Sequence, residues 1–344
     1  MRSKKPAAAL VTIIVAVGAV GTAFVLVAGA PATRLPDHRE PGLPTFQVTG
    51  FAQSTTTAAQ LRASAATLTS VSIVASSLAS DGSTLSAITD TTHTLRRDAQ
   101  SQGERVEMLV NNFDPALQAF SHITAARMLQ SEVNRSRVVQ SIAAEVSRHG
   151  WDGVTVDLEN LHRTETDGLT RFVTQLREAV GPGISISLCL MVEQQDYRDR
   201  GYDLPALTGQ VDTFVLMAYE QHGPAWSGPG PIGGYPWVRN SLAALLGQVP
   251  AAQVQLGIGG YAYLWPTRGI GTVYSTQTAR GIARDAGAVP RWSAAEQEWT
   301  ATLASGTQLW WSDERSFAAR LRLAEVEGLG GVALWSLDQA DPIE

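Results

Sequence analysis

Two carboxylates, Asp157 and Glu159, have the residue type and the spacing to do chemistry together. In the stretch 150–161 they and Thr155 alternate with three apolar residues, Val154, Val156 and Leu158. This period of two predicts a strand with one apolar and one polar face. Both acids then project from the polar face, with Cα atoms about 6.6 Å apart. Such a pair can serve as general acid and base, although a solvated edge strand would show the same spacing.

The elements that would position these acids alternate between strand and helix along the chain. The 344 residues leave room for one large domain. Eight stretches are strand candidates, and predicted helices separate most of them: 46–51, 71–76, 106–110, 154–158, 184–190, 212–217, 253–258 and 330–334. This pattern predicts a (β/α)8 TIM barrel, an α/β fold, over residues 46–344. The long gap at about 261–311 predicts a small α+β insertion between strands 7 and 8.

Further polar and aromatic residues follow the predicted strands at the end where TIM barrels carry their active sites. Asn112 follows the third strand, Met217, Tyr219 and Glu220 stand at the end of the sixth, and Trp335 follows the last. Paired acids, a tyrosine hydroxyl and a tryptophan plane suit the chemistry of sugars, because acids transfer protons at a glycosidic oxygen and aromatic rings stack on pyranose faces. Asn112 fits a turn residue equally well.

The stretch from Asp152 to Glu159, DGVTVDLE, resembles the D-x-x-D-x-D-x-E signature of family 18 glycoside hydrolases. Met217-Ala218-Tyr219-Glu220 is similar to the M-x-Y-D motif of that family, and Trp335 stands where the family has a tryptophan under the reacting sugar. Segments along almost the whole chain after residue 45 resemble the branch with spore-germination and cortex-lytic N-acetylglucosaminidases: 214–222, 230–238, 256–258 and 311–316.

The resemblance implies a role for each matching residue. Glu159 would be the general acid, and Asp157 would orient the 2-acetamido group of the substrate, whose carbonyl oxygen attacks the anomeric carbon. Tyr219 would hydrogen-bond that carbonyl, and Asp152 would be structural. The product would retain its configuration, since family 18 uses substrate-assisted catalysis in place of a carboxylate nucleophile.

Two positions depart from the family pattern. Thr155 replaces an aspartate, and we expect its hydroxyl to donate a hydrogen bond to Asp157, which would stay ionised more readily. Glu220 replaces an aspartate, and its extra methylene displaces the carboxylate by about one C–C bond, a shift that a tight site feels. The two changes motivate an alternative, a catalytically weak or inactive glycan-binding protein.

The N-terminus predicts export. Basic residues at positions 2, 4 and 5 precede an uncharged run, 7–30, which reads as a signal peptide or an uncleaved membrane anchor. Residues 31–45 form a Pro-rich linker. We therefore expect an extracytoplasmic protein, secreted or anchored to the outer face of the membrane through residues 7–30.

Charge and composition restrict the partners. Without residues 1–30 the chain has 23 arginines against 32 acids, which excludes a nucleic-acid partner. Cys189, the single cysteine, lies in an apolar run and reads as buried in a strand. No pattern of metal ligands or phosphate-binding glycines occurs, so no cofactor is implied. We expect a monomer acting on an N-acetylglucosamine-containing polysaccharide, peptidoglycan rather than chitin. A two-carboxylate glycosidase acting on sugars without an acetamido group is a third possibility.

Overall fold

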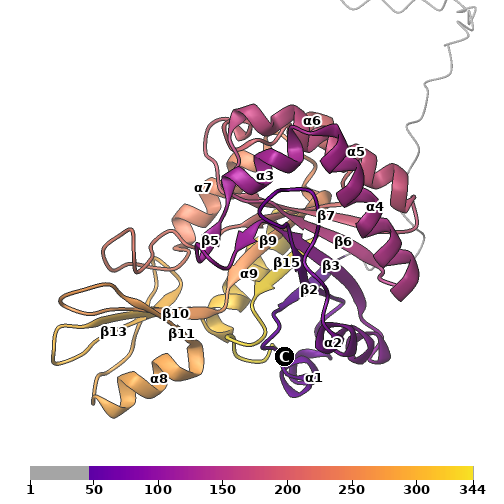
Figure 1. Ribbon diagram of the computed structural model, residues 1–344. Helices are drawn as coiled ribbons and strands as arrows, with labels where there is room; N and C mark the ends of the chain where they lie inside the picture. The colour runs from indigo at the N-terminus through magenta and orange to yellow at the C-terminus, as the bar shows by residue number, and fades with distance from the viewer. Residues whose placement is uncertain (1–45, 344) are drawn as a thin grey trace, which may run out of the picture. The chain divides into compact units, whose positions relative to one another are not determined.

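Eight parallel strands close into a barrel in the computed structural model, which describes residues 46–343 (Figure 1). The first strand pairs with both the second and the last, so the sheet has no free edge. In chain order the strands are β1 (Gln47–Ala52), β2 (Ser70–Ser77), β3 (Arg105–Asn111), β6 (Gly153–Asp157), β7 (Ser185–Met191), β8 (Thr213–Met217), β9 (Val254–Gly259) and β15 (Gly331–Trp335). The predicted TIM barrel is confirmed, with every strand within two residues of its expected bounds.

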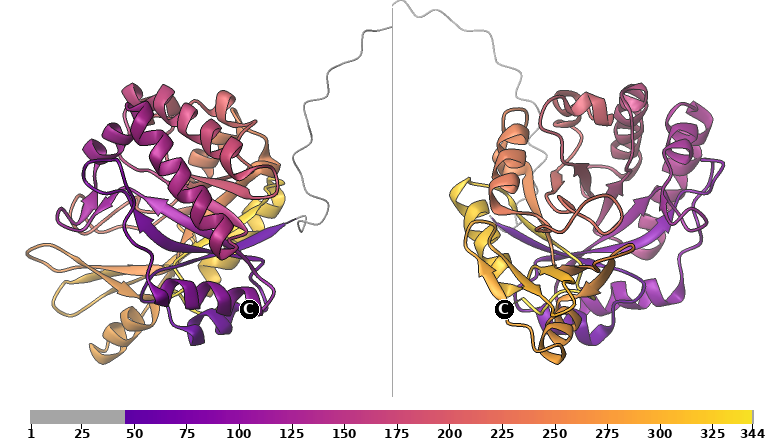
Figure 2. Two further views of the ribbon diagram at one scale, coloured as in Figure 1. Left: turned by 45° about the vertical axis from the view of Figure 1, so that its right-hand side comes forward. Right: turned by 90° about the vertical axis from the view of Figure 1, so that its left-hand side faces the viewer.

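Helices cover the outside of the barrel (Figure 2). They are α1 (Ala58–Ser64), α2 (Asp90–Ser101), α3 (His122–Leu129), α4 (Glu132–His149), α5 (Thr166–Val180), α6 (Leu204–Leu207), α7 (Tyr235–Leu246) and α9 (Glu314–Val326). The helix that precedes the paired acids, α4, shows how the sequence sets the start and the end of a helix. The Ser131 side chain accepts a hydrogen bond from the Asn134 amide at its start. It ends at Gly150, whose φ of 68° suits glycine.

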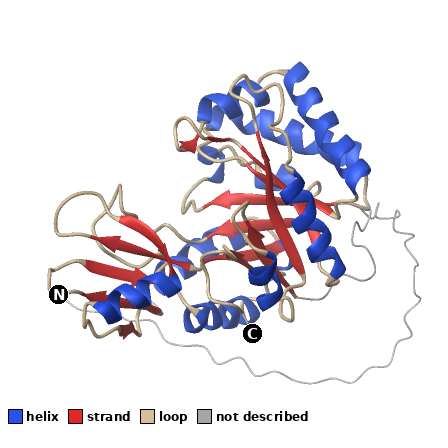
Figure 3. Ribbon diagram, turned by 60° about the horizontal axis from the view of Figure 1, so that its bottom comes forward, coloured by secondary structure: helices blue, strands red, loops and turns tan. Residues whose placement is uncertain are grey.

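The segment between β9 and α9 forms a separate antiparallel sheet with one helix (Figure 3). Its elements are β10 (Tyr261–Trp265), β11 (Thr272–Ser275), α8 (Thr276–Asp285), β12 (Arg291–Ser293), β13 (Glu298–Thr302) and β14 (Gln308–Trp311). The two faces of β10 differ. Ala262 joins the core under α8 with buried Trp311, whereas Tyr261, Tyr263 and Trp265 join an aromatic cluster that reaches Tyr219 and Trp335. The insertion therefore supports one side of the barrel mouth.

The predicted export segment and linker, residues 1–30 and 31–45, lie outside the described residues. Among residues 46–343, no helix combines the length and the apolar character needed to cross a bilayer.

Glu104, just before β3, is a buried acid whose two carboxylate oxygens have no hydrogen-bond partner within residues 46–343. Burial raises its pKa to about 7. The folded state then binds more protons than the unfolded state between about pH 4.5 and 7, so stability falls as the pH rises through that window. At pH 8 the free energy of unfolding of Glu104→Gln is expected to exceed that of wild type by about 1–3 kcal/mol. At pH 4.5 the two free energies should be nearly equal, and urea denaturation at both pH values measures the difference. An equal gain at both pH values would contradict an ionisation effect.

Candidate active site

A cleft of about 1050 Å³ opens at the carboxyl ends of the barrel strands. Six of the residues expected at the site line it together: Asp157, Glu159, Met217, Tyr219, Glu220 and Trp335. Its walls also carry four aromatic side chains, Phe113, Phe120, Trp226 and Trp237. The cleft thus combines a floor of titratable groups with walls of flat apolar rings, an arrangement that suits a chain of sugar rings.

Asp157 and Glu159 face the cleft from the end of β6, and burial is the main influence on both. It raises the pKa of Asp157 to about 7, with Glu220 adding to the rise and a hydrogen bond from the Cys189 thiol opposing it. The pKa of Glu159 rises to about 9, through burial and then through the charges of Asp157 and Glu220. At neutral pH Glu159 therefore holds its proton, as a general acid requires, while Asp157 is partly ionised. Asp157 Oδ1 is buried and has no hydrogen-bond partner within residues 46–343.

Tyr219 and Glu220 occupy the loop after β8. The Tyr219 ring meets Tyr261 of β10 edge-on, with centroids 6.5 Å apart. Glu220 has a φ of 63°, a left-handed backbone that is uncommon outside glycine and aims its side chain differently from an extended residue. Burial raises the pKa of Glu220, and a hydrogen bond from Tyr263 opposes that rise. Glu220, which is one methylene longer than the aspartate of the family motif, thus accepts a hydrogen bond from a residue of the insertion.

Asn112 positions the catalytic strand end and does not reach the cleft. Its side chain is fully buried. Its Oδ1 accepts from the Glu159 amide at 2.9 Å, and its Nδ2 donates to the Glu159 carbonyl at 2.9 Å and to the Ser121 carbonyl at 3.1 Å. This side chain is sealed behind the backbone that it holds, so of the two roles predicted for Asn112, contact with substrate or support of the site, the structure is consistent with support.

Replacing Asn112 tests that positioning. Asn112→Ala removes both bonds to the Glu159 backbone, and a displacement of about 1 Å at a reacting group can lower a rate about 100-fold. We expect kcat to fall about 10- to 100-fold with KM little changed. Asn111→Ala is the matched control, since Asn111 is also buried but accepts from Ser77 and from the Phe113 amide. Equal losses of kcat in both variants would point to general destabilisation.

Asp152 and Thr155 lie outside the cleft lining. Asp152 Oδ2 accepts from the Val106 amide at 2.9 Å and from Gln100 at 3.0 Å, which ties the start of β6 to its neighbours, the structural role that the resemblance implied. Thr155 does not donate to Asp157. Its hydroxyl donates to Glu107 Oε2 at 2.7 Å and also bonds Ser72 Oγ at 2.7 Å.

The expected hydrogen bond between Thr155 and Asp157 is therefore wrong, and the physical reason is a competing acceptor. Glu107 of β3 is buried inside the barrel and also accepts from the Ser185 hydroxyl at 2.7 Å. A charged or polar group in that interior must be hydrogen-bonded. Thr155 satisfies Glu107, and Cys189 takes the place beside Asp157.

Sequence reasoning missed several residues of the site. Cys189 was expected only as a buried strand residue. Phe113 and Phe120 belong to a short hairpin, β4 (Phe113–Asp114) paired with β5 (Ala119–Phe120), and Tyr263 comes from the insertion. The sequence held one signal for this hairpin: Phe113 and Phe120 lie seven residues apart, just after the end of a predicted strand.

The cleft lining contains no member of the metal-binding groups found within the described part of the chain. Those groups are His93 with Glu145 and His149, and His122 with His162 and Glu165.

Comparisons with known proteins agree with this geometry. Residues 86–340 match the family described as "Glycosyl hydrolases family 18". The cortical fragment-lytic enzyme of Bacillus subtilis (strain 168) is 27% identical over 265 residues, 72% of this chain and 60% of that enzyme. The protein YdhD of the same organism is 26% identical over 229 residues, 63% of this chain and 54% of YdhD. This chain thus spans less than two thirds of the length of these relatives.

Solved structures share the fold. A chitinase from Chromobacterium violaceum superposes with a TM-score of 0.77 at 23% identity, covering 86% of this chain and 95% of that one. The spore cortex-lytic enzyme SleL of Bacillus cereus gives a TM-score of 0.75 at 19% identity, covering 86% of this chain and 71% of that one. At these identities the likeness concerns the barrel.

Proposed function

The chain belongs to family 18 of the glycosyl hydrolases, and from this premise we propose that it cleaves β-1,4-linked N-acetylglucosamine polymers by a retaining, substrate-assisted mechanism. The observation that carries the proposal is the place of Glu159, in the cleft beside Asp157 and at the strand end where barrel enzymes hold their catalytic groups. Burial there raises the pKa of Glu159 to about 9, which favours the protonated form at neutral pH. Glu159 delivers that proton to the oxygen of the leaving sugar.

Asp157 and Tyr219 act on the acetamido group of the substrate. The Asp157 carboxylate, which lines the cleft, accepts the acetamido N–H, and this aligns the carbonyl oxygen for attack on the anomeric carbon. As that attack proceeds, positive charge develops on the acetamido group, and an ionised Asp157 stabilises it. Tyr219 stays protonated, since burial raises its pKa well above the usual value, so its hydroxyl can donate to the carbonyl. Water then opens the oxazolinium intermediate with retention of configuration.

The substrate that we favour is peptidoglycan over chitin, and the relation to a cortical fragment-lytic enzyme supports it. The cleft wall adds a physical reason. Among the described residues that line the cleft, Arg200 alone is basic. Its Nε bonds Glu193 Oε2 at 3.3 Å, which leaves the two terminal nitrogens of the guanidinium to receive an anion. In peptidoglycan the lactyl group of muramic acid carries a stem peptide whose free carboxylates chitin lacks, and a guanidinium binds carboxylates in a bidentate manner.

Arg200→Ala is expected to separate the two substrates. Loss of a partly exposed guanidinium–carboxylate pair weakens binding by about 1 kcal/mol. We therefore expect KM to rise about 3- to 10-fold on peptidoglycan fragments and to stay within about twofold on chitin oligomers, with Arg200→Lys intermediate. Initial rates on both substrates measure the effect. Equal losses on both would remove the argument for a carboxylate contact.

The proposed location is extracytoplasmic, with the protein secreted or held at the membrane by residues 7–30. Uncharged sequence after a basic start supports this location. Digestion of purified peptidoglycan and of chitin oligomers, with mass spectrometry of the new reducing ends, tests the function. Release of N-acetylglucosamine ends from peptidoglycan is expected, whereas binding of both glycans without turnover between pH 4 and 9 would favour the glycan-binding alternative that Thr155 and Glu220 motivate.

A further inference from the structure

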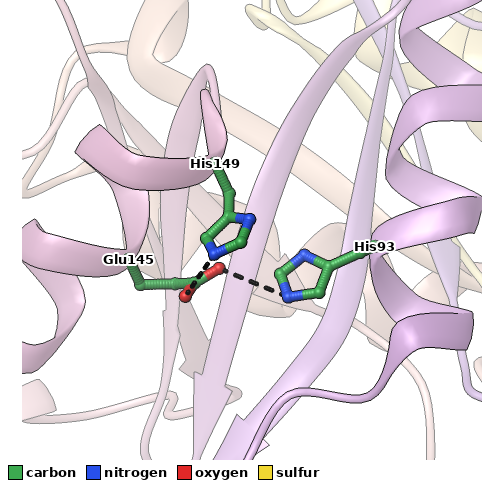
Figure 4. Close-up of side chains that lie close together, drawn as sticks. All are labelled: His93, Glu145 and His149. Atoms are coloured by element: carbon green, nitrogen blue, oxygen red, sulfur yellow. Dashed lines mark ion pairs between the residues drawn. The ribbon is translucent and has the colours of Figure 1, made fainter.

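Three side chains that could bind a metal ion meet on the outside of the barrel. His93 comes from α2, and Glu145 and His149 come from one face of α4, since residues four apart are neighbours on a helix. Figure 4 shows both imidazoles turned toward the Glu145 carboxylate. Nε2 of His93 lies 3.9 Å from Glu145 Oε1, and Nε2 of His149 lies 3.7 Å from Glu145 Oε2. One ligand atom from each residue falls within 4.8 Å of the others.

These separations are too long for hydrogen bonds, yet they approach those around a shared ion. Two ligands bound tetrahedrally to Zn²⁺ at about 2.0–2.1 Å are about 3.4 Å apart. Each gap therefore needs to close by about 1.4 Å or less. The two imidazoles are stacked, with centroids 4.2 Å apart and planes at 20°. Because an imidazole lone pair lies in the plane of its ring, the two lone pairs do not meet in this stacked arrangement, and binding requires both rings to rotate out of the stack.

The surroundings prepare these groups as ligands. Trp151 Nε1 donates to Glu145 Oε1 at 3.0 Å, which fixes the carboxylate and leaves Oε2 free, much as hydrogen bonds to ligating side chains orient them in metal sites. His93 Nδ1 is buried without a partner within residues 46–343, so no protein hydrogen bond fixes its tautomer.

We propose that His93, Glu145 and His149 bind one divalent transition-metal ion of the Zn²⁺ type, with water completing the coordination. The ion clamps α2 to α4 beside the start of β6, at the barrel end opposite the cleft. Its role is structural, and it takes no part in the glycosidase chemistry proposed above.

The second group, His122, His162 and Glu165, differs in a way that makes it an internal control. The carboxylate of Glu165 is occupied by four partners: His122 Nε2 at 3.0 Å, the His162 amide at 2.9 Å, Gln130 Nε2 at 2.9 Å and the Thr164 hydroxyl at 2.7 Å. A carboxylate with these bonds is already satisfied by the protein. We therefore expect no metal binding there.

Calorimetric titration of the chelator-treated full chain with ZnCl₂ at pH 7.5 tests the proposal, together with thermal unfolding with and without Zn²⁺. We expect one equivalent to bind and the unfolding midpoint to rise by a few degrees, because an ion that binds only the folded state stabilises it. Co²⁺ should give the visible absorption of a tetrahedral site. Binding should weaken as the pH is lowered, because protons compete with the ion for its ligands.

Matched variants locate the ion. His149→Ala and Glu145→Gln should each lose the midpoint shift and the Co²⁺ absorption, while His162→Ala keeps both. Each variant is taken as folded when its glycan cleavage and its circular dichroism equal those of wild type. If His149→Ala fails this check, His149→Gln replaces it. No binding by the wild-type chain would overturn the proposal, and so would binding that survives in His149→Ala and Glu145→Gln or disappears in His162→Ala.

Discussion

Glu159→Gln is expected to lower kcat about 10²- to 10⁴-fold on N-acetylglucosamine polymers, with KM nearly unchanged. The amide keeps the shape of the side chain but cannot give a proton to the leaving oxygen. The expected loss in kcat is therefore the usual contribution of a general acid to the rate. Initial rates of reducing-end release from peptidoglycan measure the loss. Gln195→Ala is the control, because Gln195 also lines the cleft but lies outside the motif. Hydrolysis retained by Glu159→Gln would refute the mechanism.

The same residue predicts the alkaline limit of activity. A general acid works only while protonated, so kcat/KM should fall as the pH rises through the pKa of Glu159, about 9. Asp157 acts ionised, so activity should fall as the pH drops through about 7. The expected profile is a bell with its maximum near pH 8. A maximum below pH 6 would show that the carboxylates are less buried in solution.

Asp157→Asn is expected to lower kcat about 10²- to 10³-fold, the usual effect of removing one group that stabilises developing charge. It should also change the pH profile. The charge of Asp157 helps to raise the pKa of Glu159, so its removal lowers that pKa and moves the alkaline limb to lower pH. The acidic limb assigned to Asp157 should disappear.

The pH shift separates this electrostatic role from a packing role. Cys189→Ser serves as the control, because it keeps a donor beside Asp157 and should retain both limbs. If the pH profile of Asp157→Asn differed from that of wild type only in its height, this would contradict electrostatic coupling between Asp157 and Glu159. Activity of the wild-type enzyme on fully de-acetylated substrate would contradict the substrate-assisted mechanism itself.

Much of the fold follows from local patterns. The alternation of Val154, Thr155, Val156 and Asp157 gives β6 its two faces, and the structure buries the valines in the core shared with the helices. Continuous apolar runs give β7 and β8. By contrast α2 went unpredicted, since its buried face is Thr92, Leu95, Arg96 and Ala99, which has no apolar period that sequence reasoning can detect.

The site was predictable where one strand carried it and unpredictable where separate strands met. Asp157 and Glu159 came from spacing and resemblance. The role of Asn112 needs the approach of β3 to β6, and the partner of Glu220 needs the insertion to fold over the barrel mouth. Thr155 shows the limit best: its chemistry was predicted correctly as a hydrogen-bond donor, but its acceptor depended on Glu107, 48 positions away.

The bond between Thr155 and Glu107 also restricts how this sequence can diverge. An aspartate at position 155, the family residue, would set a second carboxylate against Glu107 inside the barrel, where like charges are strongly unfavourable. That single substitution should be poorly tolerated unless position 107 has first become neutral. The two sites form an epistatic pair, so a lineage that carries Glu107 reaches the common family motif only by changing both, and in one order.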